Sequence, residues 1–397
     1  MALSRVLPTT WKVLMEDDVN NGEHPEARAA YIHVPFCKHR CGYCNFTLVA
    51  DRSDLHASYL QALELELSQL QTPRSVDTIF LGGGTPTELS ISQLQQLLQL
   101  VQRWFPLTSG GEFSVEANPT DINPELVEML RQQGVNRVSL GGQSFQSVKL
   151  QWLERDHDLV CLQNSLELLQ EHIDVVSMDL IFGLPGETIK MWAADLDRLV
   201  QFKPQHISTY GLTLEKGTRF WNQHHRGEFE LPGESLQREM FLLARRQLQR
   251  QGYDHYEVSS FALPGFRCRH NETYWLGAPY FAAGPGAARY IEGRREINHR
   301  STLTYLKKML AGESVIAEVE EIHGESRARE IFVFAMRRLD GITPEWFLQQ
   351  TGRDLYQLIG NEIKQLVDQG LLIWADDHLK LTEQGLLVSD SIWPRVL

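Results

Sequence analysis

The sequence predicts an α/β protein whose parallel sheet is curled into a full or partial barrel, followed by a small C-terminal domain. Short apolar, β-branched runs recur along the chain, and each is followed by glycine, proline or polar residues and then by a helical pattern. After about residue 302 this alternation gives way to helices and one strand pair. The first pattern indicates β-α repeats, and the change indicates a second domain.

The expected strands are the apolar runs Tyr31–Phe36, Val76–Leu81, Glu112–Glu116, Arg137–Leu140, Val175–Phe182 and His206–Leu212. Between the third and fourth runs, Asn123 and Pro124 offer an N-cap and a first-turn proline, and Gly134 is suited to end that helix. Because no strong Rossmann fingerprint accompanies the alternation, we expect a barrel, with its chemistry at the carboxyl ends of the strands.

Four segments are expected. They are an N-terminal arm at 1–26, the barrel at 27–265, a connecting segment at 266–300 and a winged-helix-like α+β domain at 301–397. Within the last segment the predicted elements are helices around Arg327–Arg338 and Leu355–Asp368, a strand pair at Leu371–Trp374 and His378–Leu381, and a final helix.

Composition narrows the class of protein. The 397 residues include 51 acidic and 38 basic ones, and a net charge of −13 makes nucleic acid a poor partner. No apolar run approaches the roughly 20 residues that span a bilayer, so neither an integral membrane segment nor a signal peptide is expected. Five cysteines with one tight cluster favour a metal site in a reducing compartment over disulfides, so we expect a cytoplasmic protein.

The cysteine cluster is a C-x3-C-x2-C run of Cys37, Cys41 and Cys44, on the loop expected after the first strand. Three thiolates can hold three corners of an iron-sulfur cubane, whereas clusters used only for electron transfer normally take a fourth cysteine. An iron without a protein ligand can bind a substrate, as an open position on catalytic zinc does. The alternative is a zinc site completed by His33 or His39.

Further polar or glycine-rich positions follow the later strands. The run from Gly82 to Thr87 opens the loop after the second strand with three glycines, whose amides could bind the amino-acid end of a small ligand. Glu116, Gln143 and Asp179 lie at the ends of other strands, and a barrel would bring them to one rim. A tight turn and structural hydrogen bonds are the alternative interpretations.

Together, the segment from Tyr31 to Cys44, the glycine loop, Gln143-Ser144-Phe145 and the run from Asp179 to Gly186 resemble the radical S-adenosylmethionine superfamily, in particular its oxygen-independent coproporphyrinogen III oxidase-like family. The resemblance covers nearly everything from Tyr31 onward. It implies a partial (β/α)6 TIM-like barrel, a [4Fe-4S] cluster on the three cysteines and S-adenosylmethionine on the fourth iron. By motif, the residues implied to contact S-adenosylmethionine are Tyr31, Tyr43, Gly83, Gly84, Thr85, Glu116, Gln143, Arg155 and Asp179. Gly142 stands where this family more often has valine.

Two features separate the branches of this family. The coproporphyrinogen oxidases carry a further cysteine two residues after the cluster motif, where this chain has Phe46. His270-Asn271-Glu272-Thr273-Tyr274-Trp275 resembles the H-N-x-x-Y-W motif of the HemW-type heme chaperones. Neutral imidazole binds heme iron, so His270 is a candidate axial ligand, and Cys268 is a second. In the alternative interpretation His270 and its neighbours only fill the core.

Three functions therefore compete. The resemblance favours a heme chaperone that keeps the cluster and S-adenosylmethionine, binds heme and passes it to heme-accepting proteins such as respiratory enzymes. The second is coproporphyrinogen III oxidation, in which hydrogen is abstracted from the propionate side chains to make protoporphyrinogen IX. The third is radical chemistry on another tetrapyrrole, such as anaerobic heme opening.

Overall fold

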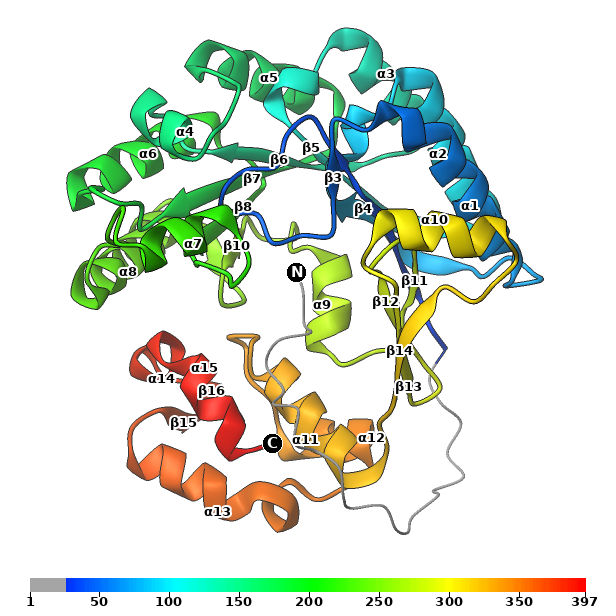
Figure 1. The fold of residues 1–397 in the computed structure, drawn as a ribbon. Helices are drawn as coiled ribbons and strands as arrows, with labels where there is room; N and C mark the ends of the chain where they lie inside the picture. The colour runs from blue at the N-terminus through cyan, green and yellow to red at the C-terminus, as the bar shows by residue number, and fades with distance from the viewer. Residues whose placement is uncertain (1–25) are drawn as a thin grey trace.

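The barrel sheet dominates the computed structural model, which describes residues 26–397 (Figure 1). The expected N-terminal arm, apart from its last residue, lies outside the described residues. Six parallel strands lie side by side in the order of the sequence. They are β1 (Ala29–Val34), β4 (Val76–Gly83), β5 (Leu107–Ala117), β6 (Arg137–Gln143), β7 (Val175–Phe182) and β8 (His206–Gly211).

The sheet continues past both outer parallel strands without closing. β11 (Phe281–Ala283) adds a parallel strand beside β1, while β10 (Ser260–Ala262) and then β9 (Asp254–His255) continue antiparallel beyond β8. Within residues 26–397, β9 and β11 are not hydrogen-bonded to each other. The expected α/β fold class, a mainly parallel barrel-like sheet followed by a smaller domain, is therefore confirmed, and the sheet is open.

Helices cover the convex face of the sheet (Figure 1). Their starts follow local sequence signals: Ser90 and Gln93 form a capping box, and the Asn123 side chain accepts a hydrogen bond from the Leu126 amide at 3.0 Å. Pro124 opens that second helix as expected. The covering helices are α1 (His56–Ser68), α2 (Ile91–Trp104), α3 (Pro124–Gln132), α5 (Leu159–His172), α6 (Ile189–Phe202) and α8 (Glu234–Arg250).

The concave side of the sheet faces α9 (Arg269–Trp275), a short helix that packs against β4 (Figure 1). Smaller elements surround the carboxyl ends of the strands. These are β2 (Phe36–Cys37), β3 (Val49–Ala50), α4 (Ser147–Trp152) and α7 (Arg219–His225). The barrel interior is thus bounded by strand-end loops on one side and by α9 on the other.

The segment around residue 301 does not separate two cores. α10 (Thr302–Leu310) places Tyr305, Leu306 and Met309 in the main hydrophobic core. β14 (Ile316–Glu321) pairs antiparallel with β13 (Arg294–Asn298), which pairs with β12 (Ala288–Ile291). A boundary at residue 301 would divide this sheet, so we propose a boundary near residue 322 instead.

Beyond residue 322 a second hydrophobic core forms around Phe332, Phe347 and Trp393. The expected helices and strand pair are present, with α12 as an addition whose signal is the Thr343-Pro344 start: Thr343 accepts a hydrogen bond from the Trp346 amide at 3.1 Å. The elements are α11 (Gly324–Ala335), α12 (Pro344–Thr351), α13 (Leu355–Asp368), β15 (Leu372–Ala375), β16 (His378–Leu381), α14 (Glu383–Leu387) and α15 (Ser389–Ile392). None of the helices in residues 26–397 combines the length and apolarity needed to cross a membrane.

Candidate cofactor site

The three cysteines lie on the loop that follows the first barrel strand, as expected. Cys37 ends the short strand β2, and Cys41 and Cys44 follow in a turn closed by the Cys44 amide donating to the Cys41 carbonyl at 3.0 Å. Cys41 is buried, the other two thiols are half-buried, and all are free. Burial raises the pKa of the Cys37 thiol to about 12. Burial also raises the pKa of the Cys44 thiol, so a bound metal would favour the thiolate forms of Cys37 and Cys44.

Residues from other strand ends surround the thiols. The Cys37 Sγ lies 3.3 Å from the Thr85 hydroxyl oxygen, and Arg155 Nη1 lies 3.8 Å from the Cys41 Sγ. Gly84 and Thr85 anchor the two loops to each other, because their amides donate to the Val34 and Phe36 carbonyls. Burial raises the pKa of the Tyr43 hydroxyl well above its usual range, although the nearby Arg155 acts in the opposite direction.

This donor set fits an iron-sulfur cluster better than a single ion. In residues 26–397, no three His, Cys, Asp or Glu side chains converge as ligands of one metal ion must. His33 is also committed elsewhere: its Nδ1 lies 3.0 Å from the Tyr31 hydroxyl and its Nε2 lies 2.6 Å from the Thr47 carbonyl. His39 lies 3.9 Å from Glu154 instead. The zinc alternative loses its fourth ligand, whereas thiols that bind separate corners of a cubane need not converge.

Two partly buried carboxyl groups, Glu116 on β5 and Asp179 on β7, form hydrogen bonds but no ion pair with the described residues. Glu116 accepts a hydrogen bond from the Gly83 amide at 2.9 Å, and Asp179 accepts one from the Ser139 hydroxyl at 3.3 Å. Within the described residues neither has an ion pair within 4.0 Å. Burial raises the pKa of Glu116 to about 7 and that of Asp179 to about 6. A ligand with a positive charge, such as the sulfonium and ammonium groups of S-adenosylmethionine, would restore the charged form of both.

Gln143 occupies the end of β6 in a backbone conformation that few residues adopt. Its φ is +65°, in the left-handed region, and its Nε2 lies 3.1 Å from the point where a Cβ on Gly141 would be. Arg155 Nη2 donates to the Gly141 carbonyl at 2.9 Å, which ties the same turn to the cysteine loop. Such strained residues concentrate at functional sites, consistent with the expected role of Gln143 at the rim.

The turn before Gln143 also explains the unusual glycine at position 142. A Cβ there would collide with the Met178 side chain and lie 3.0 Å from Leu162. Met178, on the neighbouring strand β7, therefore fills the space that a valine would occupy. Gly142 and Met178 together keep the packing behind Gln143 closed.

Sequence reasoning missed two residues of the site. Asn118 donates to the Thr85 hydroxyl at 3.0 Å and accepts from Arg155 Nη2 at 2.5 Å, so it joins the glycine loop to the arginine. Glu154 accepts from the Gly42 amide at 2.8 Å, within the cysteine run itself. Asn118 follows the Glu116 strand directly and precedes a proline, a strand-end signal that could have marked it. Glu154 has no such signal.

His270 lies deeper in the barrel, and its ring is fully engaged. Its Nδ1 lies 2.9 Å from the Thr78 hydroxyl, and its Nε2 lies 2.8 Å from the Tyr274 hydroxyl. The residue is only 1% exposed. The ring stacks on Phe80 with centroids 5.2 Å apart, and burial lowers the pKa of His270 to about 3. The second candidate, Cys268, is buried beside Glu112 at 3.6 Å.

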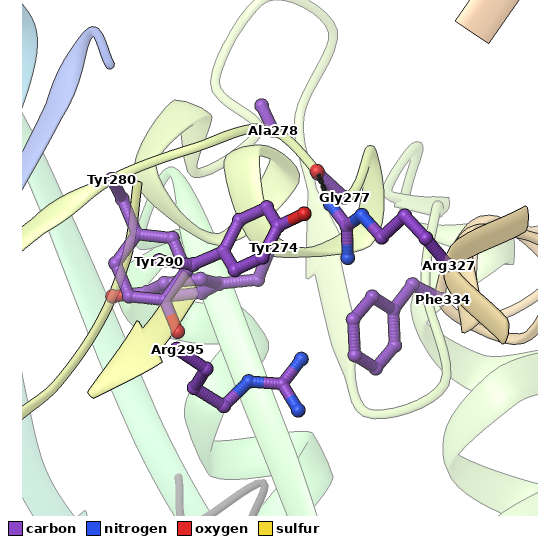
Figure 2. A pocket seen from close by; sticks show the side chains of 8 residues that line it. All are labelled: Tyr274, Gly277, Ala278, Tyr280, Tyr290, Arg295, Arg327 and Phe334. Atoms are coloured by element: carbon purple, nitrogen blue, oxygen red, sulfur yellow. Dashed lines mark hydrogen bonds between the residues drawn. The ribbon is translucent and has the colours of Figure 1, made fainter. Parts of the chain in front are cut away.

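The other side of the motif helix is closed by the C-terminal domain. Figure 2 shows Tyr274 among Tyr280, Tyr290, Arg295 and Arg327. The void that these residues line measures only about 10 Å³. Arg327, from α11, lies 4.0 Å from the Tyr290 ring centroid and donates to the Gly277 carbonyl. The structure therefore brings the cysteines together with most of the expected S-adenosylmethionine residues near the carboxyl ends of the strands. Tyr31 lies further in, with its ring centroid 6.5 Å from that of His270, so the packed motif histidine contacts one of the expected residues.

The site therefore combines three thiols suited to three corners of a cluster with carboxyl groups that form no ion pair with the described residues. This combination fits the class of radical S-adenosylmethionine proteins. Comparison with known families agrees, since the Radical SAM superfamily matches residues 31–199 and the HemN C-terminal domain matches residues 322–388. The second match starts at the boundary that the sheet pairing favours.

Relatives extend along the whole chain. Proteins named heme chaperone HemW are 34% identical over 370 residues in Lactococcus lactis subsp. lactis and 33% identical over 371 residues in Bacillus subtilis. These matches cover 93% and 92% of this chain, and 97% and 98% of the relatives. A zebrafish (Danio rerio) protein named radical S-adenosyl methionine domain-containing protein 1, mitochondrial, is 32% identical over 94% of this chain and 88% of its own length. The chain belongs to the HemW family of the radical SAM superfamily.

A solved structure supports the fold. The chain matches coproporphyrinogen III oxidase (HemN) from Escherichia coli with a TM-score of 0.82, over 94% of this chain and 91% of that one. The two sequences are 22% identical, so this likeness extends to the fold alone.

Proposed function

We propose that this chain is a heme chaperone that holds a [4Fe-4S] cluster with S-adenosylmethionine, binds heme and transfers it to acceptor proteins. The observation that supports this most is the match to relatives named heme chaperone along nearly their entire length. Membership in the HemW family and the radical SAM fold do not depend on this proposal.

In the proposed cofactor site, Cys37, Cys41 and Cys44 would hold the cluster, which would supply the electron needed to cleave S-adenosylmethionine. Arg155, whose Nη1 lies 3.8 Å from the Cys41 Sγ, would offset the negative charge of the thiolates. Glu116 and Asp179 would offset the positive charges of S-adenosylmethionine. The buried Arg155 Nε, which lacks a hydrogen-bond partner in the described residues, supports a further polar group at this site.

The chaperone proposal is preferred to coproporphyrinogen oxidation because of Phe46. The residue two places after Cys44 is an aromatic ring with 44% of its surface exposed, where the oxidases carry a further cysteine. The structural support for coproporphyrinogen oxidation is the fold shared with HemN, and a shared fold does not determine a reaction. All five thiols of the chain are free, which supports the proposed cytoplasmic location.

For His270 to bind heme iron, as the motif implies, the structure requires a local opening. One ring nitrogen must leave either Thr78 or Tyr274, and the void of about 10 Å³ beside Tyr274 must widen enough to admit a porphyrin edge. We therefore expect heme ligation by His270 to be slow compared with the first encounter of heme and protein.

The decisive test is an anaerobic titration of the cluster-reconstituted chain with heme, in parallel with an incubation with coproporphyrinogen III, S-adenosylmethionine and a reductant. We expect a saturable Soret shift and no protoporphyrinogen IX by chromatography. Absence of a Soret shift would overturn the chaperone proposal, and protoporphyrinogen formation would establish the oxidase instead. Linear tetrapyrrole products would point to heme opening.

A further inference from the structure

The loop between Cys44 and β3 forms one wall of an open cleft outside the proposed cofactor site. The cleft has a volume of about 370 Å³, and α10 begins on its other side. Its wall residues are Arg40, Asn45, Phe46, Thr47, Leu48, Val49, Arg300, Ser301, Thr302 and Leu303. Residues from both halves of the chain therefore meet here, and those of the first half lie within five positions of Cys44 in the sequence.

The charges of the cleft differ from those of the whole chain. The chain has a net charge of −13, yet the cleft is lined by two arginines and by no aspartate or glutamate. Of the described carboxylates, none lies within ion-pair distance of Arg40 or Arg300. Most other arginines near the cysteine loop are paired, such as Arg52 with Asp54 and Arg219 with Glu154. An anion would find uncompensated positive charge in this cleft.

Neutral carbonyl and hydroxyl groups hold both guanidinium groups in place. Arg40 Nη2 donates to the Leu48 carbonyl at 2.6 Å, and Arg300 Nη2 donates to the Asn45 carbonyl at 3.3 Å. Arg300 Nε also donates to the Thr47 hydroxyl at 3.3 Å. Arg40 Nη1 also donates to the Cys44 and Phe46 carbonyls at 3.4 Å. Because a guanidinium has five N–H donors, Arg40 still has its Nε–H, and Arg300 has both Nη1 donors, for a carboxylate.

Apolar side chains complete the site. Phe46 is 44% exposed and Leu303 is 52% exposed, on opposite sides of the cleft. Exposed large apolar groups beside unpaired guanidinium groups suit a ligand with a flat apolar body and carboxylates at its edge. Such a ligand is an iron porphyrin with its propionates.

We propose that this cleft is the first binding site for heme, with Arg40 and Arg300 pairing with the propionates and with Phe46 and Leu303 contacting the porphyrin face. This inference rests on the proposed heme-binding function and gives it a location separate from His270. The cleft is open to solvent, whereas the motif histidine is buried with both ring nitrogens bonded. Heme would therefore bind beside the cluster loop before any ligation deeper in the barrel.

The test compares heme affinity of the full, cluster-reconstituted chain with that of Arg300→Gln, because Arg300 is exposed and lies outside the cysteine run. We expect a Kd for heme about fivefold higher in Arg300→Gln, and near-normal affinity in Arg300→Lys, which keeps the charge. Arg103→Gln, on the outer face of α2, removes the same charge elsewhere and should leave the Kd unchanged. The cluster absorbance reports that each variant is intact.

A second ligand distinguishes propionate pairing from a general effect of charge. Iron protoporphyrin IX dimethyl ester lacks the carboxylates, so the wild-type chain and Arg300→Gln should bind it equally. Phe46→Ala should weaken both ligands, and Leu348→Ala, an exposed leucine on α12, should weaken neither. An Arg300→Gln chain that binds heme like the wild type would overturn the cleft site. A wild-type chain that does not bind heme at all would overturn the proposed function itself.

Discussion

The two ends of the barrel interior contain similar polar side chains in opposite circumstances. At the cysteine end, Glu116 and Asp179 are partly buried, and neither forms an ion pair with any of the described residues. At the α9 end, Glu112 pairs with Arg137 at 2.9 Å, and both ring nitrogens of His270 have partners. Because burying a charge without an opposite charge nearby costs free energy, we propose that the cysteine end receives a cationic ligand, whereas the pairs formed at the α9 end stabilise the fold until they open.

The contrast teaches that burial alone does not identify a functional residue. His270 is buried and Asp179 is partly buried, and both are titratable residues singled out by a motif. Only their partners distinguish them.

At the cysteine end, Cys37→Ala should abolish the cluster and leave the fold. Removing one of three thiolate ligands opens a second iron to solvent, and the remaining two cannot retain the cubane. Iron and sulfide analysis with the visible absorbance after anaerobic reconstitution measures this. Cys161→Ala, on α5, is the matched control and should retain the cluster. A Cys37→Ala chain with a full cluster would show that this loop is not the ligand set.

At the α9 end, Arg137→Met should lower stability rather than cofactor content. The substitution leaves Glu112 buried without its partner, which costs about 3–5 kcal/mol in free energy of unfolding. Arg137 also donates to the Phe266 and Arg267 carbonyls just before α9, so the loss should spread to the motif helix.

Chemical denaturation followed by circular dichroism gives the stability of the Arg137→Met chain. Arg131→Met, which breaks an exposed pair with Glu128, should change it little. A strong loss of S-adenosylmethionine binding in the folded Arg137→Met chain would contradict the view that the two ends have separate roles.

Binding of S-adenosylmethionine should strengthen severalfold as the pH rises from about 6 to about 8. Across this range Glu116, whose pKa is about 7, and Asp179, whose pKa is about 6, become carboxylates that attract the cationic ligand. The sign for the ligand-free fold is opposite: both pKa values are raised on folding, so stability decreases as the pH rises from about 4 to about 7.

Equilibrium binding at several pH values, with the cluster absorbance as a check on intactness, measures this dependence. Glu116→Gln should flatten the profile, because the glutamine does not titrate. A pH-independent affinity in the wild-type chain would contradict the assignment of these carboxyl groups to the ligand.

The smallest expected effect is kinetic. Tyr274→Phe removes the hydroxyl that lies 2.8 Å from His270 Nε2, so it should free this nitrogen and raise the rate of heme ligation a few-fold at a modest cost in stability. Stopped-flow absorbance in the Soret region separates the ligation step from the first binding step. Tyr280→Phe, a nearby tyrosine that does not bond His270, is the control. An unchanged rate would argue against ligation through Nε2.

Prediction from sequence succeeded where the signal is local. The six parallel strands, the helix start at Asn123 and the cysteine run all depend on neighbours in the chain, and each was predicted. Long-range contacts were not visible. The expected boundary at residue 301 placed β14 apart from its partner β13, and Glu154 could not be foreseen beside Gly42, because these pairings join positions far apart in the sequence.

The sequence by itself determined the chemistry that this protein can support: three thiols at cluster spacing, strand ends with carboxyl groups, and a motif with histidine and aromatic residues. Only the tertiary structure decided which of those groups have partners. Among the described residues, it left Glu116 and Asp179 without an ion pair, occupied both nitrogens of His270 and gathered Arg40 and Arg300 at one cleft. The physical reason is that a hydrogen bond or ion pair depends on distances in space, which packing of the whole chain sets.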